Sequence, residues 1–226
     1  MGILKPLADA IYSNLIREDR YMLLVRGLVS TLEITLFALL VGLIIGLFTA
    51  TVRIFKIKGV EKAAALYVNV IRGTPAVVQL IIIYYAILGS VNLDKLLVAS
   101  IAFGINSGAY VSELIRAGVG AVDKGQMEAA RSLGLSSAQS MRYVVLPQAV
   151  KNILPALVNE AIMLLKETAI AGYIALDDLT RAGNIIRSRT YDAYTPFLLV
   201  AVVYLYSTTV LSILAEKLER RLGRSD

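Results

Sequence analysis

The chain contains no cysteine and no histidine among its 226 residues. These absences exclude disulfides, thiol chemistry, histidine-based metal sites and haem with histidine ligands. The remaining aspartates and glutamates form no recognisable metal or hydrolase motif, which disfavours an enzyme. The chain also lacks a run of basic residues with interleaved aromatics, which argues against nucleic-acid binding. It has no G-x-x-x-x-G-K-[ST] phosphate loop, so it cannot hydrolyse ATP by that route.

Long apolar stretches make up most of what is present. Hydrophobic residues are 57% of the chain and charged residues 18%, and the charges lie mostly in short segments. Apolar stretches of this length are typical of membrane helices. We therefore predict an all-α polytopic membrane protein with about five transmembrane helices, at residues 27–52, 63–88, 96–111, 150–171 and 197–215. The fourth has the weakest hydropathy, because three charged residues interrupt it and Pro155 should bend it.

Residues 1–26 form a separate predicted unit before the membrane domain at residues 27–226. Leu4, Leu7, Ile11 and Leu15 recur at spacings of three and four, which indicates an amphipathic helix at the membrane surface. A solvated tail is the alternative. Polar residues interrupt the apolar stretch, so we do not expect a signal peptide.

A polar stretch at 123–148 interrupts the apolar sequence. Within it, residues 125–133 fit a short helix, with Glu128 near the positive N-terminal end. Its small face is formed by Ala129, Ala130 and Leu133. Such a face would let a partner approach closely, whereas the alternative is an ordinary polar loop.

The end of this helix is also marked in the sequence. Gly134 can adopt a positive φ and close the helix. Ser136 or Ser137 can then cap a second short helix through Arg142. Together these signals predict a compact helix–turn–helix knob outside the bilayer.

Arg72 lies inside the second predicted span, in the sequence R-G-T-P. Pro75 removes a helical hydrogen bond and Gly73 weakens the preceding turn, so we expect a kink. A charge at membrane depth costs roughly 2.5–3.5 kcal/mol, which favours a position facing the protein interior. Alternatively, Arg72 snorkels or pairs with a neighbouring carboxylate such as Glu160.

Polar residues also mark the third span and its end. Asn106, Tyr110 and Glu113 share one helix face, which should look into a bundle or a cavity. The neighbouring small residues Ser107, Gly108 and Ala109 would alternatively serve helix packing.

The fourth span carries two acidic residues on one face, Glu160 and Glu167, seven positions apart. Two acidic groups on an inward face could meet a cationic group of a ligand. The alternative is a structural ion pair, either of Glu167 with Lys166 or of Glu160 with Arg72.

The distribution of basic residues predicts sidedness. Segments 53–62, 116–151 and 217–224 hold four, five and four Lys/Arg, thirteen in all, and fall on one side of a five-span protein. The other side holds eight, and Arg72 and Lys166 are counted on neither. The positive-inside rule therefore places the polar stretch and the C-terminus in the cytoplasm and the N-terminus outside.

Several motifs resemble one protein family in the family's own order. The pattern E-A-A-R-S-L-G…L-P-Q-A at 128–149 resembles the cytoplasmic coupling loop of ATP-cassette importer permeases. R-G-T-P followed by V-V-Q-L, and N-S-G-A-Y-V-S-E, resemble the branch of that family that serves polar amino acids such as arginine, histidine and glutamine. The resemblance covers roughly residue 27 to the C-terminus.

This resemblance implies partners. A permease of this family pairs with a second permease copy, with a homodimer favoured over a paralogous partner. Two ATP-binding cassette subunits dock beneath, and an extracytoplasmic amino-acid-binding protein docks above. ATP and Mg would be held by the partner ATPase, so we expect no cofactor in this chain.

We therefore predict a non-catalytic permease subunit of the bacterial inner membrane that imports polar amino acids, with arginine favoured. Closure of the cassette dimer would drive alternating access. The predicted coupling residues are Glu128, Ala129, Ala130 and Gly134. The predicted substrate contacts are Asn106, Ser107, Tyr110, Glu160, Glu167 and Arg72. The alternative is a self-contained secondary transporter or channel, for which polar residues within spans are equally suitable.

Overall fold

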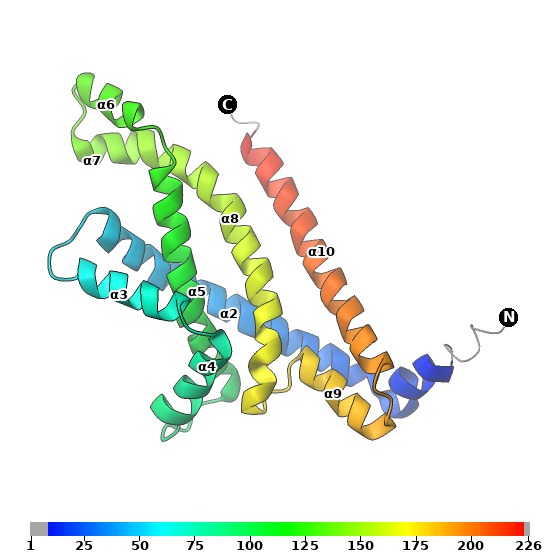
Figure 1. Ribbon diagram of the computed structural model, residues 1–226. Coiled ribbons are helices and arrows are strands. Elements are labelled where there is room, and N and C mark those ends of the chain that lie inside the picture. Colours follow the sequence, from blue (N-terminus) through cyan, green and yellow to red (C-terminus); the bar gives the residue numbers. More distant parts are fainter. Residues whose placement is uncertain (1–8, 224–226) are drawn as a thin grey trace.

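The computed structural model describes residues 9–223, and the side chains of residues 9–217. All regular secondary structure in the described part is helical, with no strand, so the all-α prediction is confirmed. The predicted positions Leu4 and Leu7 lie outside the described residues. Figure 1 shows long helices that splay apart, with the α6–α7 pair and the end of α10 at one end, and α9 at the other.

The long helices are α2 (Tyr21–Ile54), α5 (Lys95–Gly120), α8 (Leu146–Glu167) and α10 (Thr195–Gly223). The helices α2, α5 and α10 are long and apolar enough to cross a membrane. Helix α8 does not reach that degree of apolarity, in keeping with its four charged residues. Its 22 residues still extend about 33 Å, which matches the roughly 30 Å hydrocarbon layer.

The predicted second span is broken rather than merely kinked. Its two halves, α3 (Glu61–Arg72) and Ala76–Ile87, meet at an angle of 108°. The second half consists of α4 (Ala76–Ile81) and a π-helical turn, η3 (Ile82–Ile87). Pro75 adopts an extended backbone with ψ 137° and begins α4, because a proline cannot continue the hydrogen bonding of α3. The position of the break is as expected, but the single continuous span is wrong.

Helices α2 and α5 pack closely because both carry glycines four residues apart. A Cβ atom at Gly46 would lie 2.5 Å from Cγ1 of Val111, and one at Gly104 would lie 2.6 Å from Cγ1 of Val41. Gly42 and Gly108 complete the two G-x-x-x-G pairs, and Ser107 and Ile45 pack against them. Small residues of this kind let membrane helices approach closely. The packing role considered for Gly108 is therefore confirmed.

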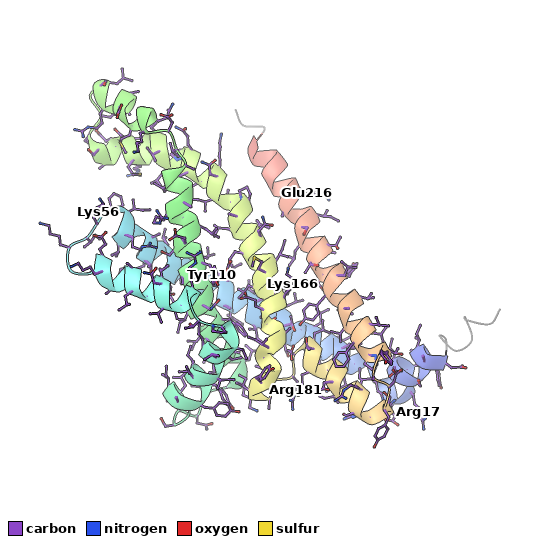
Figure 2. The ribbon with its side chains drawn as sticks, viewed as in Figure 1. Arg17, Lys56, Tyr110, Lys166, Arg181 and Glu216 are labelled. Carbon is purple, nitrogen blue, oxygen red and sulfur yellow. The ribbon has the colours of Figure 1, made fainter. Side chains whose placement is uncertain are left out.

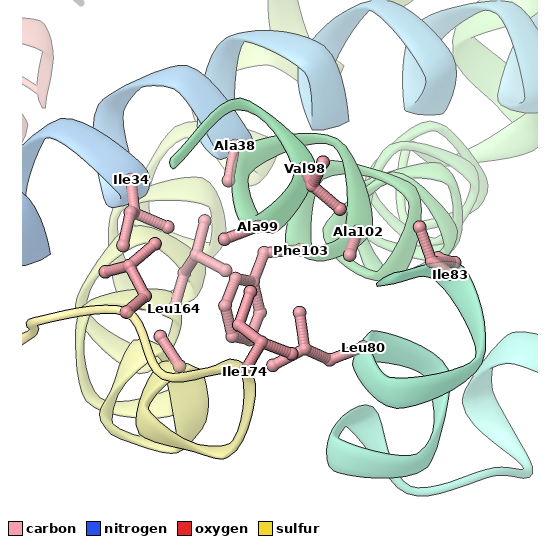
Figure 3. Close-up of a cluster of buried hydrophobic side chains, with 12 residues drawn as sticks. Ile34, Ala38, Leu80, Ile83, Val98, Ala99, Ala102, Phe103, Leu164 and Ile174 are labelled. Carbon is pink, nitrogen blue, oxygen red and sulfur yellow. The ribbon is translucent and has the colours of Figure 1, made fainter. Parts of the chain in front are cut away.

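A buried apolar cluster joins this helix pair to the rest of the fold (Figure 3). Phe103 of α5 lies at its centre, beside Leu80 of α4 and Ile174 of η5 (Thr168–Ile174), the 3-10 turn that follows α8. Ile34 of α2 and Leu164 of α8 extend the cluster. The broken span and α8 are thus anchored on the same face of α5.

The N-terminal segment is less regular than the expected amphipathic helix. It forms a π-helical turn, η1 (Tyr12–Ile16), and a 3-10 turn, η2 (Arg17–Asp19), in which Glu18 has a positive φ of 59°. Helix α2 begins at Tyr21, so it includes the last six residues of the predicted interfacial segment. The apolar residues that follow Arg20 favour continuing the membrane helix over ending it at residue 26.

Asn14 ties this segment to the corner between α9 (Leu179–Thr190) and α10. Its side-chain amide donates to Asp192 at 2.9 Å and accepts from the Thr190 hydroxyl at 2.9 Å. The Thr195 hydroxyl and the Tyr194 backbone amide also donate to Asp192, and these hydrogen bonds lower the pKa of Asp192 to about 2. Hydrogen bonds through Asn14 therefore hold the predicted surface helix against the α9–α10 corner.

Candidate functional site

Two neighbouring polar side chains of α5 are fixed by different helices. Ser107 donates its hydroxyl to the Glu160 carboxylate of α8 at 2.8 Å, and both residues are buried. Asn106 donates its amide to Gln79 of α4 at 2.9 Å. Asn106 therefore faces the bundle as predicted, whereas the other two residues of the predicted polar face, Tyr110 and Glu113, are only partly buried.

Gln79 supplies hydrogen bonds to polar groups at the break between α3 and α4, which would otherwise lack partners in an apolar environment. Its amide nitrogen lies 2.7 Å from the Ile71 carbonyl, 3.0 Å from the Thr74 carbonyl and 2.8 Å from the Thr74 hydroxyl. The last carbonyls of a helix have no partner within it, and leaving them unpaired in a bilayer is costly. Gln79 therefore supplies hydrogen bonds at the end of α3, and Asn106 holds Gln79 in place. Gln79 was not among the residues predicted from the sequence, although it lies in the V-V-Q-L motif beside the break.

Arg72 does not face the protein interior as expected. Its side chain is exposed, and its guanidinium carbon lies 5.4 Å from the centre of the Tyr110 ring. In the described part of the chain no ion pair joins Arg72 to Glu160. The chain turns by 108° directly after α3, and Arg72 there makes a cation–π contact with Tyr110 in place of the expected carboxylate partner.

Glu167 lies two helical turns beyond Glu160 on α8, as the spacing predicts. It is partly buried, whereas Lys166 is exposed, and no ion pair between them is present in the described structure. The structural pairs considered for the two glutamates are therefore wrong. Glu160 is bound instead by the uncharged Ser107, so its charge has no cationic partner within hydrogen-bonding distance in the described part of the chain.

Glu113 does not belong to the Asn106 cluster, although it shares a helix face with it. It pairs with Arg53 at the end of α2 at 2.9 Å and also with Arg116. This link fixes α2 to α5 near the polar stretch. The only signal in the sequence was the presence of opposite charges near the ends of two predicted spans.

The polar stretch forms the predicted helix–turn–helix knob (Figure 1). Its first helix is α6 (Lys124–Ser132), and Asp123 caps it by accepting from the Gly125 amide. Gly134 has a φ of +90°, and its amide donates to the Arg131 carbonyl. The next amide, of Leu135, donates to the Ala130 carbonyl, which completes a Schellman motif. The predicted role of Gly134 as the helix-closing residue is confirmed.

Two local details differ from the expectation. Glu128 is the fifth residue of α6, so the carboxylate at the positive end is that of the N-cap, Asp123. On the predicted small face, Ala130 is buried, while Ala129 is exposed and Leu133 is 85% exposed. The surface available to a partner is therefore formed by Ala129 and Leu133, with Ala130 packed inward.

The second helix of the knob is capped by Ser136, whose hydroxyl accepts from Gln139 while the Gln139 side chain accepts from the Ser136 amide. This helix does not end at Arg142 as expected. Helix α7 (Ser137–Ser140), the π-helical turn η4 (Met141–Val145) and α8 follow one another without an intervening loop. Pro147 lies in the first turn of α8, directly after this π-helical turn.

The described residues contain no group of three or more possible metal ligands. What the geometry provides is a buried carboxylate with a hydroxyl donor between membrane helices, and a rigid knob with an exposed small face. These features agree with a polytopic membrane protein that carries a helical knob at one end of its long helices.

Comparison with known proteins agrees with this class. Residues 38–224 match the family of binding-protein-dependent transport system inner membrane components. The chain belongs to this family and is a transport subunit of the membrane, not a catalytic one.

Individual relatives cover most of the chain. It is 38% identical over 205 residues to the arginine transport system permease protein ArtQ of Bacillus subtilis, covering 90% of this chain and 94% of that protein. It is 39% identical over 203 residues to the glutamine transport system permease protein GlnP of Escherichia coli, covering 88% and 93%.

Solved structures agree with the fold. A crystal structure of an amino acid ABC transporter with histidines matches with a TM-score of 0.84 at 46% identity, covering 89% of this chain and 94% of that one. The inward-facing methionine ABC transporter MetNI matches with a TM-score of 0.78 at 21% identity, which concerns the fold alone.

Proposed function

We propose that this chain is the permease subunit of an ATP-driven importer for polar amino acids, with arginine as its favoured substrate. Relatives named for arginine and glutamine support the amino-acid class, as does the solved amino acid transporter at 46% identity. The observation that carries the preference for arginine is the buried Glu160 carboxylate, whose hydrogen-bond partner among the described residues is a neutral serine hydroxyl. A buried charge is stabilised by a partner of opposite sign, which a guanidinium or ammonium group of the substrate would supply.

The remaining predicted contacts have distinct roles in this proposal. Ser107 orients the Glu160 carboxylate, and Glu167 adds a second acidic group on the same helix. Arg72, stacked on Tyr110, is available to bind the carboxylate that every amino acid carries. Asn106 acts through Gln79, which supports the break at the end of α3.

The free energy from ATP would be transmitted to this chain through α6. The exposed Ala129 and Leu133 would contact a cassette ATPase, and the Schellman turn at Gly134 would keep α6 at a fixed angle to the continuous helix that follows. A second copy of the chain would complete the transport pathway, and an external binding protein would deliver the amino acid. In the proposed orientation α6 and the C-terminus are cytoplasmic and the N-terminus is extracytoplasmic.

The test is uptake by vesicles that contain the chain, its cassette ATPase and the binding protein. Labelled arginine, glutamine and histidine are measured with and without ATP for the wild type and Glu160→Gln. Glu160→Gln should reduce arginine uptake by about tenfold or more while glutamine uptake changes much less, because only arginine presents a permanent side-chain cation. Glu33→Gln, an exposed glutamate on α2, is the matched control and should change neither.

The coupling role is tested with glycines of similar backbone strain. Gly134 (φ +90°) and Gly59 (φ +86°) both have open space where a Cβ would lie. Valine at either position would destabilise the left-handed backbone by roughly 1–2 kcal/mol relative to glycine. Gly134→Val should abolish ATP-dependent uptake, whereas Gly59→Val should largely preserve it. Equal losses in both variants, or uptake that needs no ATPase, would refute the proposed coupling.

A further inference from the structure

The loop that joins α2 to α3 carries alternating basic and apolar side chains. We call residues 55–62, which include the first two residues of α3, the basic loop; it contains Lys56, Lys58 and Lys62, all exposed, and one acidic residue, Glu61. Between them lie three apolar side chains that are also exposed, Phe55 (60%), Ile57 (44%) and Val60 (44%). Among the described residues, none of these three lysines takes part in a salt bridge that holds the fold together, and the nearby Glu113 is paired with Arg53 and Arg116.

The backbone of the loop is ordered by hydrogen bonds rather than by side-chain packing. The Ile57 amide donates to the Val52 carbonyl, and the intervening Lys56 has a φ of +50°. Glycine is the residue that normally occupies this position after a helix. Gly59, the other residue of the loop with a positive φ, is indeed a glycine. At residue 56 this positive-φ position holds a long cationic side chain, although glycine would adopt the same backbone with less strain.

The loop continues the apolar outer surface of α2. Ile44 and Phe48 of α2 are 72% and 64% exposed, and Phe55 follows at a spacing that places it on the same side of the helix. We expect this exposed apolar stripe to face lipid, which would bring the loop at its end to the level of the head groups. Figure 2 shows Lys56 at the outer edge of this turn, away from the helical bundle.

We propose that the basic loop binds anionic phospholipid head groups. Its lysines would contact the phosphates, while Phe55, Ile57 and Val60 would enter the boundary of the acyl chains. Amphipathic segments with interspersed lysines bind membrane surfaces in this way. The proposal rests on the proposed orientation only in assigning these lipids to the cytoplasmic leaflet.

The chain contains no tryptophan, so a single introduced tryptophan can report on the lipids beside the loop. We would reconstitute full-length Phe55→Trp in bilayers of phosphatidylcholine and phosphatidylglycerol, with one or the other lipid brominated. The difference in fluorescence quenching gives the relative affinity for the anionic lipid at that position. Phe197→Trp, at the start of α10 near the opposite end of the fold, is the control.

Each lysine near an anionic surface contributes about fivefold to affinity. The Phe55→Trp variant should therefore report a preference for phosphatidylglycerol that adding Lys56→Gln and Lys58→Gln lowers by about 25-fold at low salt. Adding Arg187→Gln and Arg189→Gln instead, which removes two charges from α9, should leave the preference unchanged. Lys56→Gly should lower it about fivefold without loss of folding, because it relaxes the backbone.

Equal quenching of the Phe55→Trp variant by both lipids, or the same anionic preference in the Phe197→Trp variant, would overturn the proposal. So would a loss of lipid quenching in the Phe55→Trp variant on addition of a tryptophan-free cassette ATPase, because the loop would then be an ATPase contact. This measurement needs no transport, so its outcome is independent of the uptake experiment above.

Discussion

Gly118 provides a sharp test of how α5 packs on α8 beside the knob. A Cβ atom at this position would lie 2.2 Å from Cγ1 and 3.1 Å from Cδ1 of Ile153, whereas favourable carbon contacts lie at about 3.5–4.0 Å. Overpacking of this kind costs about 1–3 kcal/mol, and the better helix propensity of alanine returns at most about 1 kcal/mol. We therefore expect Gly118→Ala to lower the free energy of unfolding by about 1–2 kcal/mol.

The same geometry predicts that Ile153→Ala compensates in part for Gly118→Ala. Ile153→Ala alone should cost about 2–5 kcal/mol through the cavity that it leaves. It also removes both clashing atoms, and the new methyl group at residue 118 partly fills the cavity. The double variant should therefore be more stable than the sum of the single changes by about 1–2 kcal/mol.

The assay is reversible unfolding of the purified chain in mixed micelles, followed by circular dichroism. Gly120→Ala, two residues further along α5, is the matched control, because no atom lies within 4 Å of the Cβ it would add. Additive effects within about 0.5 kcal/mol, or equal effects of the changes at Gly118 and Gly120, would refute the packing argument.

Three further predictions concern other elements. Gln79→Leu should destabilise the fold by about 1–3 kcal/mol by leaving helix-end carbonyls unpaired, and proteolysis near the α3–α4 break should increase. The pKa of Asp192 is about 2 when folded and ordinarily near 3.8, so its stabilisation is present above pH 3.8 and is lost as the pH falls toward 2. Thermal unfolding of the wild type should show this loss between about pH 4 and 2, and Asp192→Asn should lack that component. Ser136→Ala should cost about 1 kcal/mol through loss of the cap, measured in the same micelle unfolding assay, with the exposed Ser137→Ala as control.

The features that the sequence predicts well are local ones. Gly134 and the serines that follow it are turn and capping residues whose preferences operate within a few positions, so α6, its end and the start of α7 could be placed. Of the two possible caps, the structure uses Ser136, because Gln139 three residues later completes a capping box. The long apolar helices can also be predicted, because hydropathy is a property of the residues within each helix.

The features that sequence reasoning missed depend on which helices become neighbours. Pro75 marks a break, but its 108° angle depends on the hydrogen bonds between Gln79, Asn106 and the end of α3. The Arg53–Glu113 pair spans sixty residues of sequence. Within the candidate site, Ser107 contacts Glu160 and Arg72 contacts Tyr110, and no spacing rule relates residues on different helices.

The absence of a loop between the knob and α8 has a mechanical consequence. From Ser137 to Glu160 the helical path is about 35 Å at 1.5 Å per residue, and it includes the π-helical turn η4 but no break. Figure 1 shows that the path bends between α7 and α8, so the straight lever is α8 itself. Glu160 lies about 21 Å along this helix from Leu146, and a tilt of α8 by about 10° about that end displaces the Glu160 carboxylate by about 4 Å. That displacement exceeds the length of the hydrogen bond to Ser107, so a small tilt of α8 relative to α5 is enough to release the buried carboxylate from α5.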